Sequence, residues 1–183
     1  NIRVDIPIVG DIRQVLARFA EKAEPLDIAD WRETVIGYKT AYVPTGEDRD
    51  DCVEPRSFIR ALSRMMHERA ILVADVGQNQ IWSARNFNVK EGRFLTSGGL
   101  GTMGYALPAA IGAKIAKPHR QVVAICGDGA FQMSMMELAT ACQQKIPVKL
   151  ILMDNSRLGM VKELQDKLYG SRYEATLLDG NPD

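Results

Sequence analysis

From about residue 53 onward, the apolar positions show two kinds of spacing along the chain. Short apolar runs predict strands, and stretches with apolar residues three or four positions apart predict helices. The strand-like runs are residues 70–76, 94–96, 122–126 and 148–153. The helix-like stretches are residues 56–67, 81–86, 105–116, 133–144 and 158–169. Strands alternating with helices predict an α/β fold, with a parallel sheet flanked by helices on both faces.

The first 54 residues have a different pattern. Residues 2–9 alternate like a strand that needs a sheet to join, and Gly10 and Asp11 form a turn before a predicted helix over residues 12–22. Asp11 is placed to be the N-cap of that helix. A second helical pattern covers residues 27–42. Residues 44–54 are polar, acidic and rich in turn formers, which predicts a linker.

Composition narrows the class of protein. The chain has 183 residues, 46% of them hydrophobic, which suits one core with an appendage. With 23 basic and 23 acidic residues the net charge is zero, so nothing favours nucleic acid or an anionic membrane as a partner. No apolar stretch reaches the ~20 residues that span a bilayer. Three cysteines without CxxC spacing favour reduced thiols in a cytoplasmic protein over zinc or disulfides.

An oxygen-bearing side chain follows each of two predicted strands. Gly127-Asp128-Gly129 follows the run 122–126, and Asn155 follows the run 148–153. The step of 27 residues between Asp128 and Asn155 leaves room for a crossover helix, so the strands can be parallel neighbours. Mg²⁺ prefers such oxygen ligands together with phosphate and water. The simpler alternative is an ordinary turn in which Asp128 caps a helix.

A glycine-rich loop, Gly99-Leu100-Gly101-Thr102-Met103-Gly104, follows the predicted strand 94–96. Its spacing matches the dinucleotide fingerprint, but that site also needs an acidic residue about 20 positions later. No Asp or Glu occurs between Glu91 and Asp128, which disfavours a nicotinamide site. The loop therefore predicts close backbone approach to another ligand, with Met103 either facing that ligand or filling the core.

Neutral amides, in Gly77-Gln78-Asn79-Gln80, follow the predicted strand 70–76. They can bind a diphosphate or heterocycle, or simply cap the next helix. The sequence has no P-loop and no GxSxG elbow, and His67 and His119 lie among charged residues, where we expect surface positions. We therefore expect the chemistry to come from a cofactor, or from residues outside this chain.

Taken together, these motifs resemble the large subunit of acetolactate (acetohydroxyacid) synthase, a thiamine-diphosphate-dependent enzyme. Gly127-Asp128-Gly129 with Asn155 is similar to the diphosphate and magnesium signature of that family. More specific are the stretches 96–110, 76–82 and 158–161, and the ending 181–183. The resemblance implies that residues 1–22 end a middle FAD-binding domain, residues 23–52 are a helical linker, and residues 53–183 form an incomplete C-terminal diphosphate-binding domain.

The resemblance also implies roles for individual residues. Mg²⁺ would be bound by Asp128, Asn155 and the main-chain carbonyl of Arg157. Met103 would press the pyrimidine of the cofactor toward its thiazolium, and Met160, Val161 and Leu164 would form the substrate pocket. The residues that would line thiamine diphosphate also include Gln78, Asn79, Gly101, Gly127, Gly129, Ala130, Gly159 and Met160. A structural FAD would lie near Asp11, Gln80 and Gly98.

Two departures qualify the resemblance. The family usually has Trp where this chain has Leu164, which puts a preference for 2-oxobutyrate over pyruvate as acceptor in doubt. The activating glutamate of the family belongs to an N-terminal domain outside this chain. We therefore expect this chain to be a C-terminal piece of a larger protein, inactive by itself.

The activity implied is decarboxylation of pyruvate and transfer of the hydroxyethyl unit to a second 2-oxo acid, in branched-chain amino-acid biosynthesis. The family also implies a cytoplasmic homodimer or tetramer with active sites at the subunit interface, and a small regulatory subunit. The alternatives are another enzyme with the same metal signature (pyruvate oxidase, glyoxylate carboligase or a 2-oxo acid decarboxylase) and a non-catalytic diphosphate-binding module.

Overall fold

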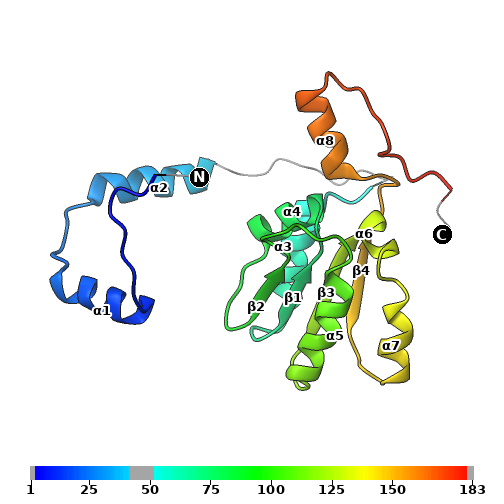
Figure 1. The fold of residues 1–183 in the computed structure, drawn as a ribbon, viewed down its shortest axis with the longest axis horizontal. Helices are drawn as coiled ribbons and strands as arrows, with labels where there is room; N and C mark the ends of the chain where they lie inside the picture. The colour runs from blue at the N-terminus through cyan, green and yellow to red at the C-terminus, as the bar shows by residue number, and fades with distance from the viewer. Residues whose placement is uncertain (1–2, 42–51, 181–183) are drawn as a thin grey trace. The chain divides into compact units, whose positions relative to one another are not determined.

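The computed structural model describes residues 3–41 and 52–180, and the chain divides into two compact units, Asn1–Pro44 and Thr45–Asp183 (Figure 1). The first unit contains helices α1 (Ile12–Lys22) and α2 (Ala29–Ala41). Asp11 caps α1, because its Oδ1 accepts a 3.1 Å hydrogen bond from the N–H of Gln14. Both predicted helices are therefore confirmed. The predicted domain boundaries after residues 22 and 52 stay predictions.

The strand predicted over residues 2–9 is wrong for its described part, since residues 3–10 form no strand. The alternating side chains of Val4, Ile6 and Ile8 are exposed rather than packed on a sheet. A strand needs neighbours for its main-chain N–H and C=O groups, and the described part of the first unit is helical apart from loops. An alternating pattern alone therefore did not form a strand here.

The second unit is built on one parallel sheet. Its strands are β1 (Ile71–Ala74), β2 (Arg93–Thr96), β3 (Val122–Gly127) and β4 (Lys149–Met153). Their order is β2-β1-β3-β4, and each neighbouring pair is parallel. The two central strands, β1 and β3, are apolar and buried, as expected for a parallel sheet covered on both faces. The predicted α/β class is confirmed.

Helices cover both faces of this sheet (Figure 1). On one face, Leu72 and Ile125 pack with residues of α3 (Pro55–Met65) and α4 (Gln78–Asn86). On the other face, Val73 and Ala124 pack with α5 (Ala106–Ala116), and α5 in turn contacts α7 (Glu137–Gln143). The short helix α6 (Asp128–Gln132) follows β3 directly, and α8 (Gly159–Leu168) follows β4.

Two helix predictions need correction. Helix α4 begins at Gln78, so Gln78, Asn79 and Gln80 form its first turn rather than a preceding loop. The helix predicted over 133–144 is shorter than expected. Residues 133–136 form tight turns in which N–H groups bond to carbonyls three residues back, α7 covers only Glu137–Gln143, and the short helix α6 lies before this stretch. The small residues Gly129 and Ala130 let α6 start at once where β3 ends. Periodicity locates such boundaries poorly.

Residues 44–51 of the predicted linker, 44–54, lie outside the described part of the chain. Its last residue, Glu54, belongs to the fold instead. Glu54 is buried and caps α3: Oε2 accepts a 2.7 Å bond from the N–H of Ser57, and Oε1 accepts a 2.6 Å bond from Nε of Arg56. Pro55, with no N–H to satisfy, starts the helix. An acidic residue before a proline was therefore a helix cap.

Two further observations concern the cysteines and the lengths of the helices. Cys52, Cys126 and Cys142 are free thiols, and only Cys126 is buried. Within residues 3–41 and 52–180 no helix is both long and apolar enough to cross a bilayer.

Candidate functional site

The carboxyl ends of the strands bring the predicted ligand residues together. Gly127 at the end of β3 pairs with Met153 at the end of β4. The next residues along each strand, Asp128 and Asp154, therefore start side by side, and Asn155 follows at once. Residues that are 27 positions apart in the sequence therefore share one edge of the sheet, as expected for neighbouring parallel strands joined by a crossover connection.

Asp128 is the most informative side chain of this edge. It is 6% exposed, and its Oδ1 accepts a 2.9 Å hydrogen bond from the N–H of Gly129. Its Oδ2 is buried and has no hydrogen-bond partner. Burial raises the pKa of Asp128; the Gly129 N–H lowers it, and the nearby Asp154 carboxylate raises it further. A buried carboxylate oxygen without a donor is costly unless a cation binds it.

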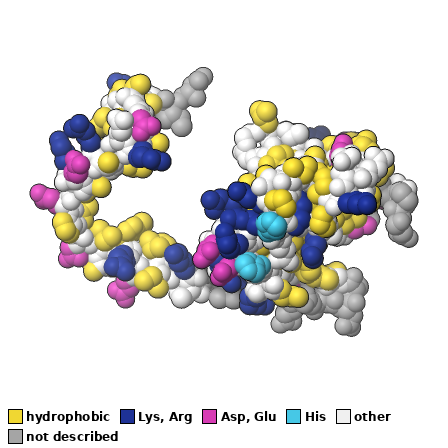
Figure 2. Space-filling model, turned by 90° about the horizontal axis from the view of Figure 1, so that it is seen from below, with side chains coloured by type: hydrophobic (Ala, Val, Ile, Leu, Met, Phe, Trp, Pro, Cys, Tyr) yellow, Lys and Arg dark blue, Asp and Glu magenta, His cyan; other side chains and the backbone are white. Residues whose placement is uncertain are grey.

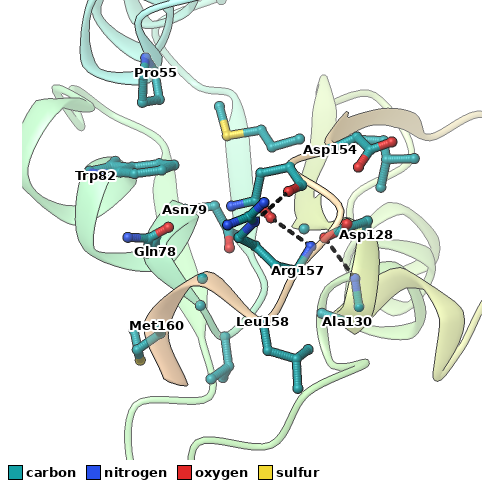
Figure 3. A pocket seen from close by; sticks show the side chains of 18 of the residues that line it. Pro55, Gln78, Asn79, Trp82, Asp128, Ala130, Asp154, Arg157, Leu158 and Met160 are labelled. Carbon is teal, nitrogen blue, oxygen red and sulfur yellow. Dashed lines mark hydrogen bonds between the residues drawn. The ribbon is translucent and has the colours of Figure 1, made fainter. Parts of the chain in front are cut away.

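The loop between β4 and α8 has a fixed shape. The amide Oδ1 of Asn155 accepts a 3.2 Å bond from the N–H of Arg157, and Nε of Arg157 donates to the carbonyl of Asn155 at 3.2 Å. Asp154 Oδ1 accepts a 2.8 Å bond from the N–H of Ser156. Figure 3 shows Arg157 and Asp128 at the centre of the cavity, with Asp154 beside them.

Residues 176–178 form main-chain hydrogen bonds with the loop between β4 and α8. The N–H of Leu158 donates to the carbonyl of Thr176 at 2.8 Å, and the N–H of Leu178 donates to the carbonyl of Ser156 at 2.9 Å. Thr176 is buried. The loop that carries Asn155 and Arg157 is thus fixed on both sides, which is the preorganisation that a binding site needs.

The first turn of α4 supplies amides to the same edge. Asn79 is buried, and its Nδ2 donates to the carbonyls of Asp75 at 3.0 Å and Ile125 at 3.3 Å. Asn79 therefore ties the end of β1 to β3. Gln78 reaches across to α8, where its Nε2 donates to Oε2 of Glu163 at 3.3 Å. Asn79 thus links two strands of the sheet, and Gln78, which lines the cavity, links α4 to α8.

Two glycines allow close approach around the ligand residues. A Cβ on Gly159 would lie 2.2 Å from Oε1 of Gln78 and 2.9 Å from Nδ2 of Asn155. A Cβ on Gly129 would lie 2.5 Å from Cδ2 of Leu158, 3.1 Å from Cδ1 of Leu178 and 3.7 Å from Cε of Met103. Both positions require the absence of a side chain, so the turns can close around a ligand.

These elements enclose a cavity of about 590 Å³, a volume in the range of small-molecule sites. Most predicted site residues line it: Gln78, Asn79, Met103, Gly127, Asp128, Gly129, Ala130, Asn155, Arg157, Gly159, Met160 and Val161. Its lining also includes residues that the sequence did not single out, among them Val53, Pro55, Phe58, Trp82, Leu152 and Asp154. Figure 3 shows Pro55 and Trp82 across the cavity from Asp128.

Other predicted residues lie elsewhere. Gly101 and Leu164 are exposed and are not among the residues that line the cavity. Nε2 of Gln80 donates to Oγ1 of Thr96 at 2.8 Å, and Gly98 is exposed on the glycine loop. Asp11 caps α1 in the first unit. The roles given to these residues stay predictions.

Asp75 is the structural residue that the sequence analysis missed. It is 1% exposed, and its carboxylate accepts hydrogen bonds from the N–H groups of Val76 at 2.8 Å, Gly104 at 3.0 Å and Ala106 at 2.7 Å. Asp75 thus anchors the glycine loop to the end of β1. Its position just after a strand, like that of Asp128, was the available signal.

Acid–base side chains are scarce at this site. Both histidines, His67 and His119, are exposed, and Figure 2 shows histidine side chains (cyan) at the surface of the molecule. The charged residues in the cavity lining are Asp128, Asp154 and Arg157. The described cavity can therefore bind a hard cation, a phosphate group and an apolar body, and it needs a cofactor for chemistry.

Sequence comparison agrees with this geometry. Residues 75–183 match the family described as "Thiamine pyrophosphate enzyme, C-terminal TPP binding domain". The chain is 42% identical to the probable acetolactate synthase large subunit of Methanocaldococcus jannaschii over 100% of its own length, and 38% identical to the isozyme 3 large subunit of acetolactate synthase from Escherichia coli, again over 100%. It is 45% identical to the acetolactate synthase large subunit of Corynebacterium glutamicum over 96% of its length. The chain spans about a third of the length of these curated relatives, between 29% and 33%.

Proposed function

The chain belongs to the thiamine pyrophosphate enzymes, and from this premise we propose that its cavity binds thiamine diphosphate through one Mg²⁺ ion. The observation that carries the proposal is the buried, unpartnered Oδ2 of Asp128 at the end of β3. Beside it, β4 delivers the amide of Asn155. A carboxylate, an amide oxygen and a main-chain carbonyl are ligands that suit Mg²⁺, which takes its remaining ligands from phosphate and water.

The residues present fit both groups. Asp128, Asn155 and the carbonyl of Arg157 would hold the metal. Gly129, at the start of α6, lets Leu158 and Leu178 approach the main chain next to Asp128. Gly159, at the start of α8, lets the side chains of Gln78 and Asn155 approach the main chain. Main-chain N–H groups of such turns favour a diphosphate. The polar end of the cofactor would therefore lie at the sheet edge, beside Gly127, Asp128 and Asn155.

The apolar part of the cavity suits the rings of the cofactor. Met103 lies near Gly129, with its Cε 3.7 Å from where a Cβ would be, and it lines the cavity. We infer that Met103 would contact the rings of the cofactor and help to position them. Gln78, Asn79, Gly101 and Ala130 would complete its surroundings. When bound, thiamine diphosphate supplies the reactive carbon and the electron sink for loss of CO₂ from a 2-oxo acid.

We propose that the whole protein is an acetolactate synthase, which decarboxylates pyruvate and transfers the two-carbon unit to a second 2-oxo acid. The identity to acetolactate synthase large subunits over nearly the whole chain supports this. Met160 and Val161 line the cavity from the first turn of α8, and with Leu164 they would provide apolar contacts to the substrate. Such contacts exclude water and orient the acceptor.

A product assay tests this function. The full-length protein is incubated with Mg²⁺, thiamine diphosphate and pyruvate, with and without 2-oxobutyrate. Acetolactate, joined by 2-aceto-2-hydroxybutyrate when both acids are present, is the expected result. Acetaldehyde or acetyl phosphate would instead identify a decarboxylase or an oxidase with the same metal site. Cofactor binding without any product would favour the non-catalytic module.

Further features remain proposals from the resemblance. They are a structural FAD near Asp11, Gln80 and Gly98, a cytoplasmic homodimer or tetramer, and pairing with a small regulatory subunit. The name "large subunit" carried by the relatives supports the last of these. In the described structure Asp11 accepts the N–H of Gln14, and Gln80 donates to Thr96. Flavin absorbance of the purified protein tests its presence.

A further inference from the structure

Asp154 is a carboxylate at the proposed metal site that the function above does not use. It follows β4 as Asp128 follows β3, because Gly127 and Met153 are paired. Both carboxylates line the same cavity, and Asp154 lies close enough for its charge to act on Asp128. Figure 3 shows the two side chains on the same side of the cavity.

A pair of acidic side chains alone does not make a site. Here Asp128 adds an independent observation, because it is 6% exposed and its Oδ2 lacks any hydrogen-bond partner. Asp154 differs, since its Oδ1 already accepts the N–H of Ser156 at 2.8 Å and is held in position by that bond. Asp128 thus has an oxygen free to bind a cation, and the carboxylate of Asp154 is fixed beside it.

The side chains that line the cavity carry more negative than positive groups. Two carboxylates, Asp128 and Asp154, face one guanidinium, that of Arg157. Nε of Arg157 is bonded to the carbonyl of Asn155. Without a metal the lining therefore carries a net negative charge, which opposes the entry of an anionic diphosphate and attracts a divalent cation. When one divalent cation is bound, the net charge of the lining becomes positive.

We propose that Asp154 is a second carboxylate for the divalent cation, and that the pair lets the protein bind the cation before thiamine diphosphate arrives. The inference rests on the proposed function, because it concerns the same metal site. It assigns Asp154 a positioning and charge-supplying role, by direct contact or through a bound water. It predicts an ordered sequence in which the metal binds first and the cofactor second.

The test uses Mn²⁺ alone as the probe, in the full-length protein without thiamine diphosphate, and measures bound Mn²⁺ by electron paramagnetic resonance. The wild type is expected to bind Mn²⁺. Asp154→Asn keeps an oxygen for the Ser156 N–H but removes the charge, and it should weaken Mn²⁺ binding by about 10–100-fold. Asp154→Glu should retain more of the affinity. The matched control Glu91→Gln removes an exposed charge from the loop before β2, and should leave binding unchanged.

The outcomes separate this inference from the proposed function. Equal Mn²⁺ affinity in the wild type and Asp154→Asn would overturn the inference, and so would a wild type that binds no Mn²⁺ without the cofactor. The proposed site would still stand if Mg²⁺-dependent binding of thiamine diphosphate were present in the wild type and lost in Asp128→Asn. If Asp128→Asn bound the cofactor normally, both would fail. Circular dichroism of each variant shows that the fold is retained.

Discussion

Oδ2 of Asp75 accepts a 2.7 Å hydrogen bond from the main-chain N–H of Ala106, 31 residues further along the chain. The other oxygen, Oδ1, accepts the N–H groups of Val76 and Gly104. One buried carboxylate thus fixes the end of β1, the glycine loop and the start of α5. Met103, which lines the cavity, directly precedes Gly104, one of these bonded positions.

Asp75→Ala should destabilise the fold. The substitution leaves three N–H groups without their acceptor in a buried place, and we expect it to lower the free energy of unfolding by about 3 kcal/mol. Urea unfolding of wild type and variant measures the loss. Glu68→Ala, at an exposed position, is the control and should change stability little. A loss for Asp75→Ala no greater than that of the control would contradict the anchoring role.

Gly159→Ala should damage binding more than folding. The new Cβ would lie 2.2 Å from Oε1 of Gln78 and 2.9 Å from Nδ2 of Asn155, so both side chains must move. We expect affinity for thiamine diphosphate with Mg²⁺ to fall on the order of 10–100-fold, measured by calorimetry. Gly112→Ala, in the interior of α5, has open space around its Cβ and should bind normally. Equal affinities of the two variants would argue against the close approach.

The Glu54 cap should make stability depend on pH. Burial raises the pKa of Glu54, but hydrogen bonds from Arg56 and Ser57 outweigh burial and lower the pKa from 4.5 to about 2. The ionised carboxylate therefore contributes stability that is fully present above pH 4.5 and is lost as the pH falls toward 2.

Urea unfolding of wild type and Glu54→Gln checks this dependence. The gap in unfolding free energy between the two proteins should be largest near neutral pH and should narrow at about pH 3. A gap that stays constant over this range would show that the Glu54 charge contributes nothing to the fold.

Leu164→Trp should change the choice of acceptor. Leu164 lies on α8 one turn after Met160 and is 49% exposed, so an indole there has room to extend toward the cavity. We expect the ratio of 2-aceto-2-hydroxybutyrate to acetolactate, from mixed 2-oxobutyrate and pyruvate, to rise by about tenfold. Leu168→Trp, one turn further and 69% exposed, is the control. Identical product ratios for both variants would remove Leu164 from the acceptor pocket.

The positions of Asp128 and Asn155 at one sheet edge could be predicted because they depend on few assumptions. Apolar runs located β3 and β4, and the length between Asp128 and Asn155 made those strands parallel neighbours. The pairing of Gly127 with Met153 then follows from the sheet itself. Side chains at the carboxyl ends of adjacent parallel strands must share an edge.

Other features depend on contacts that are distant in the sequence. Asp75 is important because Gly104 and Ala106 fold back onto it, and Trp82 lines the cavity because α4 packs beside it. The start of α4 at Gln78 was missed because amides suit a cap as well as a helix turn. Residues 3–9 alternate correctly but have no strand beside them in the described part of their unit. Local pattern cannot supply such partners.

Calorimetric titration of thiamine diphosphate into the full-length protein with Mg²⁺, comparing wild type with Asp128→Ala, tests the central claim most directly. The buried carboxylate of Asp128, with its unpartnered Oδ2, is the ligand on which the proposed metal site depends. We predict magnesium-dependent binding in the wild type and none in Asp128→Ala. Undiminished affinity in the variant would contradict the assignment of this cavity as the diphosphate and magnesium site.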